Sequence, residues 1–126
     1  MEQTYDSAAA EAINLLAERV HKNNKNWWTN LQTGEPLKRN VGEMLMLVVS
    51  EISEAMEGHR KSLMDDHLPN RPMVEVELAD ALIRILDISA GLGLDLGGAY
   101  VQKMEYNRTR ADHQKEARLA PGGKAY

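Results

Sequence analysis

The chain has 126 residues, 43% of them hydrophobic, a length that suits one compact domain and is too short for two. Its net charge of -4 and the absence of a long basic run argue against binding to the phosphates of DNA or RNA. Cysteine is absent, which excludes disulfides and thiolate metal sites. No apolar stretch approaches the roughly 20 residues that span a bilayer, and the first residues do not resemble a signal peptide. We therefore expect a cytoplasmic protein that binds neither membranes nor nucleic acid polymers.

The first expected helix covers residues 7–22, where an apolar stripe repeats at helical spacing through Ile13, Leu16, Ala17 and Val20. Residues 23–40 have no period, are rich in Asn and contain Gly34 and Pro36. This composition predicts a long loop. Loops of this length inside a small domain are often functional.

Two further helices should follow the loop. Asn40 and Glu43 have the spacing of a capping box, which predicts a helix from there to about Lys61. A polar connection leads to Pro72, a residue suited to the first position of the next helix, which should end near Ala90.

A fourth helix is expected from about Leu96 to His113, with Asp95 as its N-cap. We expect residues 117–126 to form a flexible tail behind a domain of residues 1–116. No alternating pattern predicts a strand, so the predicted class is all-α with four helices.

Acidic residues interrupt the two central helices. Glu51 and Glu54 border the apolar stripe of the second helix. The third helix is apolar almost all round, which is typical of a buried helix, and its polar residues gather in one seam formed by Glu77, Asp80, Arg84 and Asp87. If the helices pack antiparallel, four carboxylates converge, and such oxygen ligands suit Mg²⁺ or Mn²⁺. The alternative is that each acidic pair is simply a solvated helix face.

These residues resemble the signatures of the MazG-like all-α nucleoside triphosphate pyrophosphatases. That family carries E-E-x-x-E on one helix and E-x-x-D on the next. Here residues 50–54, Ser-Glu-Ile-Ser-Glu, match all but the first position, and residues 77–80, Glu-Leu-Ala-Asp, match fully. A Lys, an Asn and an Arg on the following helix correspond to Lys103, Asn107 and Arg110, which share one helix face. Residues 39–72 further resemble small single-domain members from bacteriophages and bacteria.

The resemblance implies a four-helix MazG-like bundle that hydrolyses a nucleotide to its monophosphate and pyrophosphate. It implies one to three Mg²⁺ ions, for which Mn²⁺ would substitute, held by Glu51, Glu54, Glu77 and Asp80. Glu51 or Glu54 would also orient or deprotonate the attacking water. Lys103 and Arg110 would contact phosphate, and Asn107 would donate a hydrogen bond.

The resemblance is compatible with several nucleotide substrates. The likeness to phage proteins favours nucleotide-pool control, with a purine deoxynucleotide such as dGTP as a candidate and the host cytoplasm as the location if a phage encodes the chain. Relatives that act on dUTP or phosphoribosyl-ATP supply alternatives with the same site.

Three more residues are candidates for substrate contacts. The loop contains adjacent tryptophans, one of which would stack on a base while the other pins the loop, and we favour Trp28 for the base. Asn23, Asn24 or Asn26 would read a base edge, with Asn24 as the candidate that we name. Lys61 is a candidate phosphate ligand, although a basic residue at a helix C-terminus also complements the helix dipole. We expect Arg84 and Asp87 to form pairs rather than to touch substrate.

Self-association is expected from the apolar third helix, which exposes more apolar surface than one small bundle hides. The resemblance implies a homodimer or homotetramer. A reading from another class is a non-catalytic helical dimerisation module, in which the acidic seam forms salt bridges between subunits.

Overall fold

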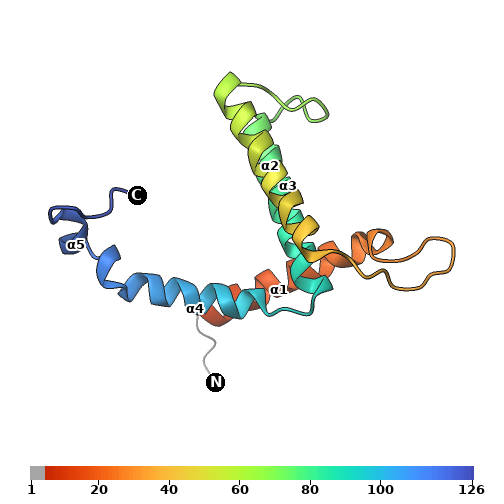
Figure 1. Cartoon of the computed structure of the whole chain (residues 1–126), viewed down its shortest axis with the longest axis horizontal. Coiled ribbons are helices and arrows are strands. Elements are labelled where there is room, and N and C mark those ends of the chain that lie inside the picture. The colour runs from red at the N-terminus through yellow and green to blue at the C-terminus, as the bar shows by residue number, and fades with distance from the viewer. Residues whose placement is uncertain (1–4) are drawn as a thin grey trace. The chain divides into compact units, whose positions relative to one another are not determined.

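A computed structural model of the chain describes residues 5–126, which form helices and loops and contain no strand (Figure 1). The all-α prediction is confirmed. Four helices are long and one is short: α1 (Tyr5–Asn23), α2 (Val41–Lys61), α3 (Met73–Gly91), α4 (Leu96–Thr109) and α5 (Lys115–Leu119). Single 3-10 turns occupy Lys25–Trp27 and Ala111–His113. None of the helices in the described range has the length and apolar character needed to cross a bilayer.

Two of the predicted helix starts are confirmed by their caps. The side chain of Asn40 accepts a hydrogen bond from the backbone N–H of Glu43 at 3.0 Å. Asp95 accepts one in the same way from Gly98 at 2.9 Å. Each cap satisfies a backbone donor that the helix itself leaves unpaired. Pro72 differs slightly from the prediction, because it is the residue before α3 rather than its first residue.

The C-terminal end differs from the prediction. Helix α4 ends at Thr109 instead of near His113, since Arg110 has an extended backbone and its guanidinium pairs with Asp112. The short helix α5 then runs into the predicted tail. There Arg118 donates to the backbone oxygens of residues 124 and 125. The flexibility of residues 117–126 stays a prediction.

The chain divides into two compact units, which we describe separately. One unit is Leu15–Leu94, and the other joins the described part of residues 1–14 to Asp95–Tyr126. In the second unit α4 meets α1 closely at Gly97, where an added Cβ would lie 2.1 Å from the carbonyl oxygen of Ala10. Asn14 ties the two helices together, because it accepts from the Gly97 N–H and donates to Asp95, both at 2.8 Å.

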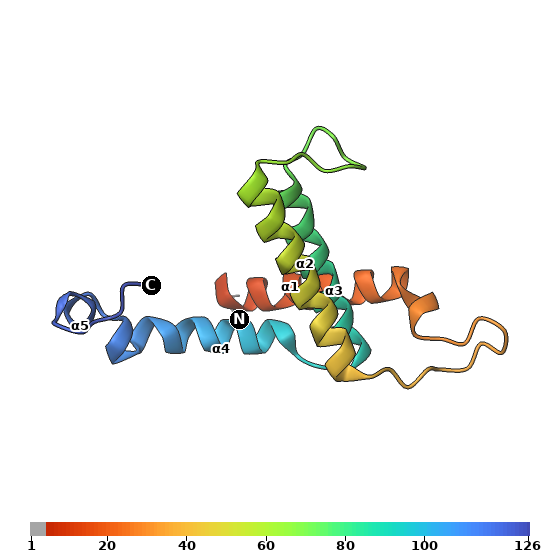
Figure 2. The same cartoon turned by 45° about the horizontal axis from the view of Figure 1, so that its top comes forward.

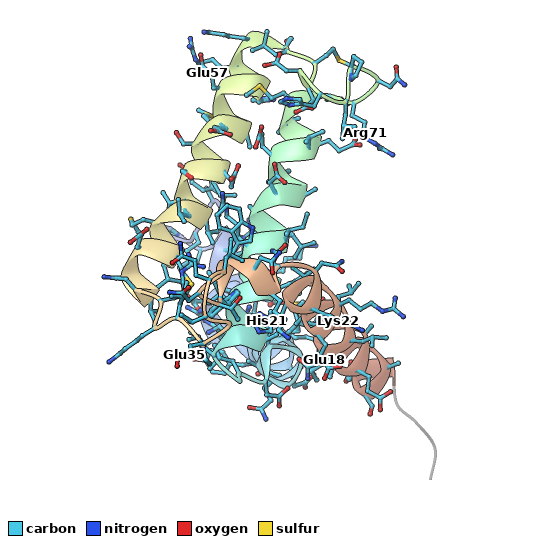
Figure 3. The ribbon with its side chains drawn as sticks, turned by 90° about the vertical axis from the view of Figure 1, so that its right-hand side faces the viewer. Glu18, His21, Lys22, Glu35, Glu57 and Arg71 are labelled. Atoms are coloured by element: carbon cyan, nitrogen blue, oxygen red, sulfur yellow. The ribbon has the colours of Figure 1, made fainter. Side chains whose placement is uncertain are left out.

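In the unit Leu15–Leu94, α2 and α3 lie side by side and antiparallel (Figures 1 and 2). A loop joins the two helices and closes this hairpin. It lies at the end of the hairpin where Figure 3 labels Glu57 and Arg71. Gly58 allows the close approach there, since a Cβ at this position would lie 2.7 Å from the Met73 side chain. All but one of the buried apolar residues of this unit come from these two helices, and half of them are alanines. They are Ala17 on α1, Met44 and Ala55 on α2, and Ala81, Leu86 and Ile88 on α3.

One side of each hairpin helix stays exposed although it is apolar. We name these surfaces the apolar stripes: Leu45, Val49, Ile52 and Met56 on α2, and Leu78, Leu82 and Ile85 on α3. Their exposed fractions range from 39% for Ile85 to 63% for Met56. The expectation that α3 is buried all round is therefore not met within one chain, because α2 covers only one side of it.

Candidate functional site

Three carboxylates from the two hairpin helices meet. Glu51 on α2 and Glu77 and Asp80 on α3 each place a carboxylate oxygen within 4.8 Å of the others. The antiparallel packing causes this, because it turns the Glu51 edge of α2 toward the acidic seam of α3. The predicted convergence is confirmed for these three residues, which we call the acidic cluster.

The fourth predicted ligand, Glu54, borders the acidic cluster. Its side chain is exposed, one turn along α2 from Glu51. Its charge and hydrogen bonding act on Glu77 across the hairpin. The position that departs from the family signature, Ser50, uses its hydroxyl to donate to the backbone oxygen of Leu47 at 2.7 Å, within its own helix.

The three carboxylates of the acidic cluster have pKa values that are shifted in different directions. Burial, and then hydrogen bonding and repulsion from Glu51 and Glu54, raise the pKa of Glu77 to about 7. Burial also acts to raise the pKa of Glu51, but hydrogen bonds, first of all from Arg84, outweigh it and leave that pKa below its usual value. Burial and the Glu51 charge raise the pKa of Asp80. At neutral pH Glu51 is therefore ionised while Glu77 still holds part of a proton.

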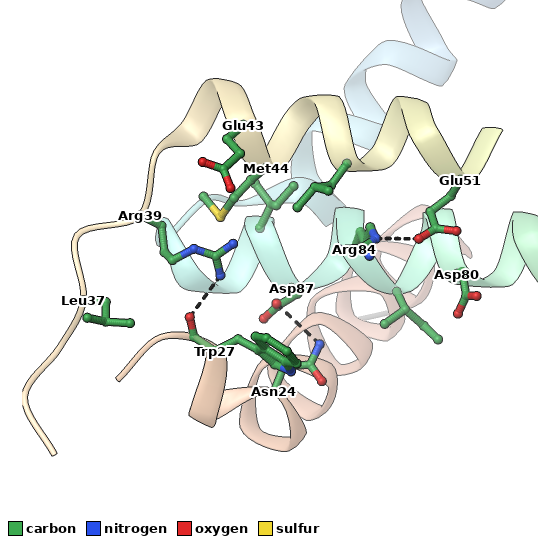
Figure 4. A pocket seen from close by; sticks show the side chains of 13 residues that line it. Asn24, Trp27, Leu37, Arg39, Glu43, Met44, Glu51, Asp80, Arg84 and Asp87 are labelled. Carbon is green, nitrogen blue, oxygen red and sulfur yellow. Dashed lines mark hydrogen bonds and ion pairs between the residues drawn. The ribbon is translucent and has the colours of Figure 1, made fainter. Parts of the chain in front are cut away.

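A cavity of about 620 Å³ adjoins the acidic cluster, a size typical of small-ligand sites (Figure 4). Glu51, Asp80 and Arg84 line one end. Trp27, Arg39 and Glu43 lie toward the other end, where the long loop enters α2. Apolar side chains form much of the remaining wall: Leu37, Met44, Leu47, Ile83 and Ile88.

Asp87 fixes the long loop against α3. Its carboxylate accepts from the His21 ring at 2.9 Å, from the indole N–H of Trp28 at 3.0 Å and from the Asn24 amide at 3.4 Å. Asn24 also lines the cavity, as its predicted substrate role requires. The prediction that Asp87 and Arg84 form pairs is confirmed, since Arg84 bonds to Glu51.

The two tryptophans have different surroundings. Trp28 packs against α3 so closely that a Cβ on Gly91 would lie 2.4 Å from its ring, and it does not line the cavity. Trp27 is 71% exposed and does line the cavity. The structure thus gives Trp28 the anchoring role and leaves the Trp27 ring available for a ligand, the reverse of the choice favoured from the sequence.

Two of the predicted phosphate ligands, Lys103 on α4 and Arg110 just after it, lie over one aromatic ring. The Lys103 ammonium lies 4.8 Å and the Arg110 guanidinium 5.7 Å from the ring centroid of Tyr106. Arg110 also pairs with Asp112 at 2.7 Å. The Asn107 side-chain oxygen is buried without a hydrogen-bond partner in the described part of the chain. These residues belong to the unit that contains α4, whereas the acidic cluster belongs to Leu15–Leu94.

Lys61, the remaining sequence candidate, lies at the end of α2 and pairs with Glu57. It does not line the cavity. Arg39 and Glu43 do line it, and sequence reasoning missed both, because a lone Arg and a capping-box Glu carry no pattern of a binding site. Arg84 carried a weak signal, since it follows Asp80 by one helical turn within the acidic seam.

Comparison of the chain with protein-family models, with curated proteins and with solved structures found no match.

The raised pKa of Glu77 predicts a pH-dependent stability. A carboxyl whose pKa rises from 4.5 to about 7 on folding stabilises the protein below the lower value, and this contribution is lost as the pH rises through the upper one. With chelator present, Glu77→Gln should therefore gain about 1–3 kcal/mol of unfolding free energy relative to wild type between pH 5 and pH 8. Urea denaturation across that range measures the difference.

Glu75→Gln is the matched control, because Glu75 is an exposed carboxylate on the same helix, paired with Arg71. Its stability relative to wild type should change little over the same range. Curves for wild type and Glu77→Gln that stay parallel from pH 5 to pH 8 would contradict the crowded cluster.

Proposed function

We propose that the protein is a Mg²⁺-dependent nucleotide pyrophosphohydrolase of the MazG-like all-α type. It hydrolyses a (deoxy)nucleoside triphosphate to the monophosphate and pyrophosphate. The observation that carries this proposal is the meeting of Glu51, Glu77 and Asp80, because two of them, Glu51 and Asp80, also line one end of a cavity of about 620 Å³.

The acidic cluster fits a hard divalent cation. Its donors are all carboxylate oxygens, the ligand type that Mg²⁺ and Mn²⁺ prefer. The pKa of Glu77 is raised to about 7, first by burial and then by hydrogen bonding with and repulsion from Glu51 and Glu54. A cation there would replace the proton on Glu77 and relieve this repulsion. Glu54 would complete the ligand set.

The chemistry divides among the side chains. Glu51, Glu77 and Asp80 would hold Mg²⁺, which would supply positive charge to offset the negative charge of the phosphates. Glu51 is ionised at neutral pH and held in place by Arg84, so it serves as a ligand. Glu54 is the exposed carboxylate at the edge of the cluster, and it is the better placed of the two to orient and deprotonate the water.

The far end of the cavity suits a purine. The exposed Trp27 ring offers a stacking surface for a base. Arg39 carries donors of the kind that read O6 and N7 of guanine. The Glu43 carboxylate would accept the two adjacent N–H groups of the same base, and Asn24 would contact its edge. This donor and acceptor set supports dGTP ahead of dUTP or phosphoribosyl-ATP.

Lys103 and Asn107 on α4, together with Arg110 just after it, would bind the phosphate chain. The Lys103 ammonium and the Arg110 guanidinium lie over the same Tyr106 ring, so two positive charges are close together. Asn107 would donate a hydrogen bond to phosphate through its side-chain NH₂ group. We propose that they act on the site of their own chain or on that of a neighbour. Lys61 is a weaker candidate because Glu57 already pairs with it.

Self-association would complete the bundle. The apolar stripes of α2 and α3 repeat at helical spacing and remain exposed in one chain. Surfaces of this kind are typical of subunit interfaces. We propose that they pair in a homodimer or homotetramer and so form a four-helix core from two hairpins. The same stripes favour the second reading, a non-catalytic dimerisation module.

Nucleotide turnover tests the proposal directly. With Mg²⁺ and all canonical NTPs and dNTPs at equal concentration, we expect monophosphate and pyrophosphate as products and dGTP as the fastest substrate, measured by anion-exchange chromatography. Asp80→Asn and Glu54→Gln should each lower kcat by about 100-fold or more because they remove a metal ligand or the base. Both should keep the helical circular dichroism of wild type.

Asp66→Asn controls for the loss of a surface charge, since this exposed carboxylate lies in the loop between α2 and α3. Its kcat should equal that of wild type. If wild type releases no pyrophosphate from any nucleotide and the two site variants lose their helical signal, the protein is a non-catalytic dimerisation module and not an enzyme.

The tryptophans separate base binding from loop anchoring. Trp27→Ala should raise KM for the preferred nucleotide about 5- to 100-fold through lost stacking, with little change in stability. Trp28→Phe keeps a ring but removes the N–H bonded to Asp87, so it should lower unfolding free energy by about 1–2 kcal/mol. A raised KM in Trp28→Phe alone would instead make Trp28 the residue that stacks on the base.

Charge on an apolar stripe should separate the subunits. We expect wild type to sediment as a dimer or tetramer and Ile52→Glu to sediment as a monomer, because a carboxylate would be buried at the interface. Leu31→Glu is the control, since Leu31 is 75% exposed in the long loop. Sedimentation of wild type as a monomer at tens of micromolar would rule out the proposed pairing.

A further inference from the structure

Arg84 connects the acidic cluster to the cavity. It lies on α3 one turn after Asp80, and its Nε donates to Oε1 of Glu51 at 2.8 Å (Figure 4). Its side chain is 41% exposed, whereas that of Glu51 is 11% exposed. The guanidinium therefore reaches the cluster from the side of the open cavity rather than from within the helix packing.

Most of the guanidinium is not used by the protein. Nε makes the bond to Glu51, and neither terminal nitrogen of Arg84 has a hydrogen bond to the rest of residues 5–126. A guanidinium holds its N–H donors in a rigid fork, so fixing Nε also fixes the direction of the remaining donors. Since Arg84 lines the cavity, these donors are available to a ligand inside it.

A ligand that reaches both ends of the cavity would pass Arg84. The cavity has two cationic lining residues, Arg84 beside the carboxylates and Arg39 beside the loop. Arg39 already donates to the backbone oxygen of Trp27 at 3.0 Å. A nucleotide with its base against Trp27 and its phosphates toward the acidic cluster would place an anion next to the free donors of Arg84.

We propose that Arg84 is a phosphate-binding residue of the substrate site, which grips a phosphate oxygen with its terminal N–H groups while Nε holds Glu51 in place. The proposal rests on the function proposed above and extends it to a residue that the sequence assigned only to ion pairing. Arginine suits this double role because its fork serves a carboxylate and a phosphate at once, which a lysine point charge does not.

Measurements of metal binding and of phosphate binding can distinguish this double role from a role in orienting Glu51 alone. If Arg84 only orients Glu51, its loss weakens metal binding. If it also supplies positive charge to the phosphates, its loss weakens phosphate binding, while the metal binds at least as tightly because a nearby positive charge has gone.

Arg84→Gln tests this, because the Gln amide still offers Glu51 one donor but carries no charge. We expect KM for the nucleotide and Ki for inorganic tripolyphosphate to rise about 10- to 100-fold. The Kd of Mn²⁺ in titration calorimetry without nucleotide should stay equal or fall. Arg84→Lys, which keeps the charge without the fork, should recover part of the tripolyphosphate affinity and serves if Arg84→Gln does not fold.

Arg60→Gln is the matched control, since Arg60 also pairs with a glutamate, Glu57, but does not line the cavity. Its KM, Ki and Kd should equal those of wild type. Unchanged KM and Ki in Arg84→Gln, or a weaker Mn²⁺ affinity as the sole effect, would overturn the phosphate role.

If the proposed function is wrong, the experiment gives a result that differs from failure of the Arg84 proposal. Wild type would then hydrolyse no nucleotide, and calorimetry with Mn²⁺ and tripolyphosphate would decide the role of Arg84 alone. Binding that Arg84→Gln loses and Arg60→Gln keeps supports a phosphate site at Arg84. Equal binding by wild type and Arg84→Gln, or none by either, overturns it.

Discussion

The burial of several carboxylates close together is the constraint on which the candidate site depends. The antiparallel pairing of α2 and α3 brings Glu51, Glu77 and Asp80 into one small volume. The Arg84 guanidinium offsets part of the negative charge. The pKa of Glu77 is raised to about 7, chiefly because this side chain is buried, so a proton there offsets a further part. Such an arrangement costs folding free energy unless something else gains from it. The cation site that we propose would supply that gain, which is why we interpret the crowding as functional rather than structural.

The second support of the site is the anchor of the long loop. Asp87 lies two turns along α3 from Asp80, so the same helix face carries the acidic cluster and the loop anchor. By accepting from His21, Asn24 and Trp28, Asp87 holds the end of α1 and the loop against α3. The cavity wall at Trp27 is thereby set by the helix that also presents the carboxylates. In the proposed function, base recognition and phosphate chemistry would therefore both depend on α3.

Features that depend on local or periodic physics were predictable from the sequence. The caps at Asn40 and Asp95 follow from side chains that reach their own backbone, and the acidic seam follows from helical spacing. The meeting of the carboxylates needed only the further assumption of antiparallel packing.

Other features depend on how the chain folds back on itself. The roles of Trp27 and Trp28 were not separable, because adjacent residues in a loop without a period have no predictable direction. The early end of α4 depends on the ion pair of Arg110 with Asp112, a contact that spacing alone does not favour over another helical turn. The metal, the nucleotide and the assembly lie outside what a single chain displays, and they stay proposals.

The contact between Gly91 and the Trp28 ring links two positions that are far apart in the sequence. Because a Cβ at position 91 would occupy the space of the indole, any side chain there requires a smaller ring at position 28. A smaller residue at position 28 would in turn give up the N–H that Asp87 accepts. Evolutionary drift at these three positions should therefore be concerted, so that homologous chains with a bulkier residue at 91 have also replaced the indole and its carboxylate acceptor.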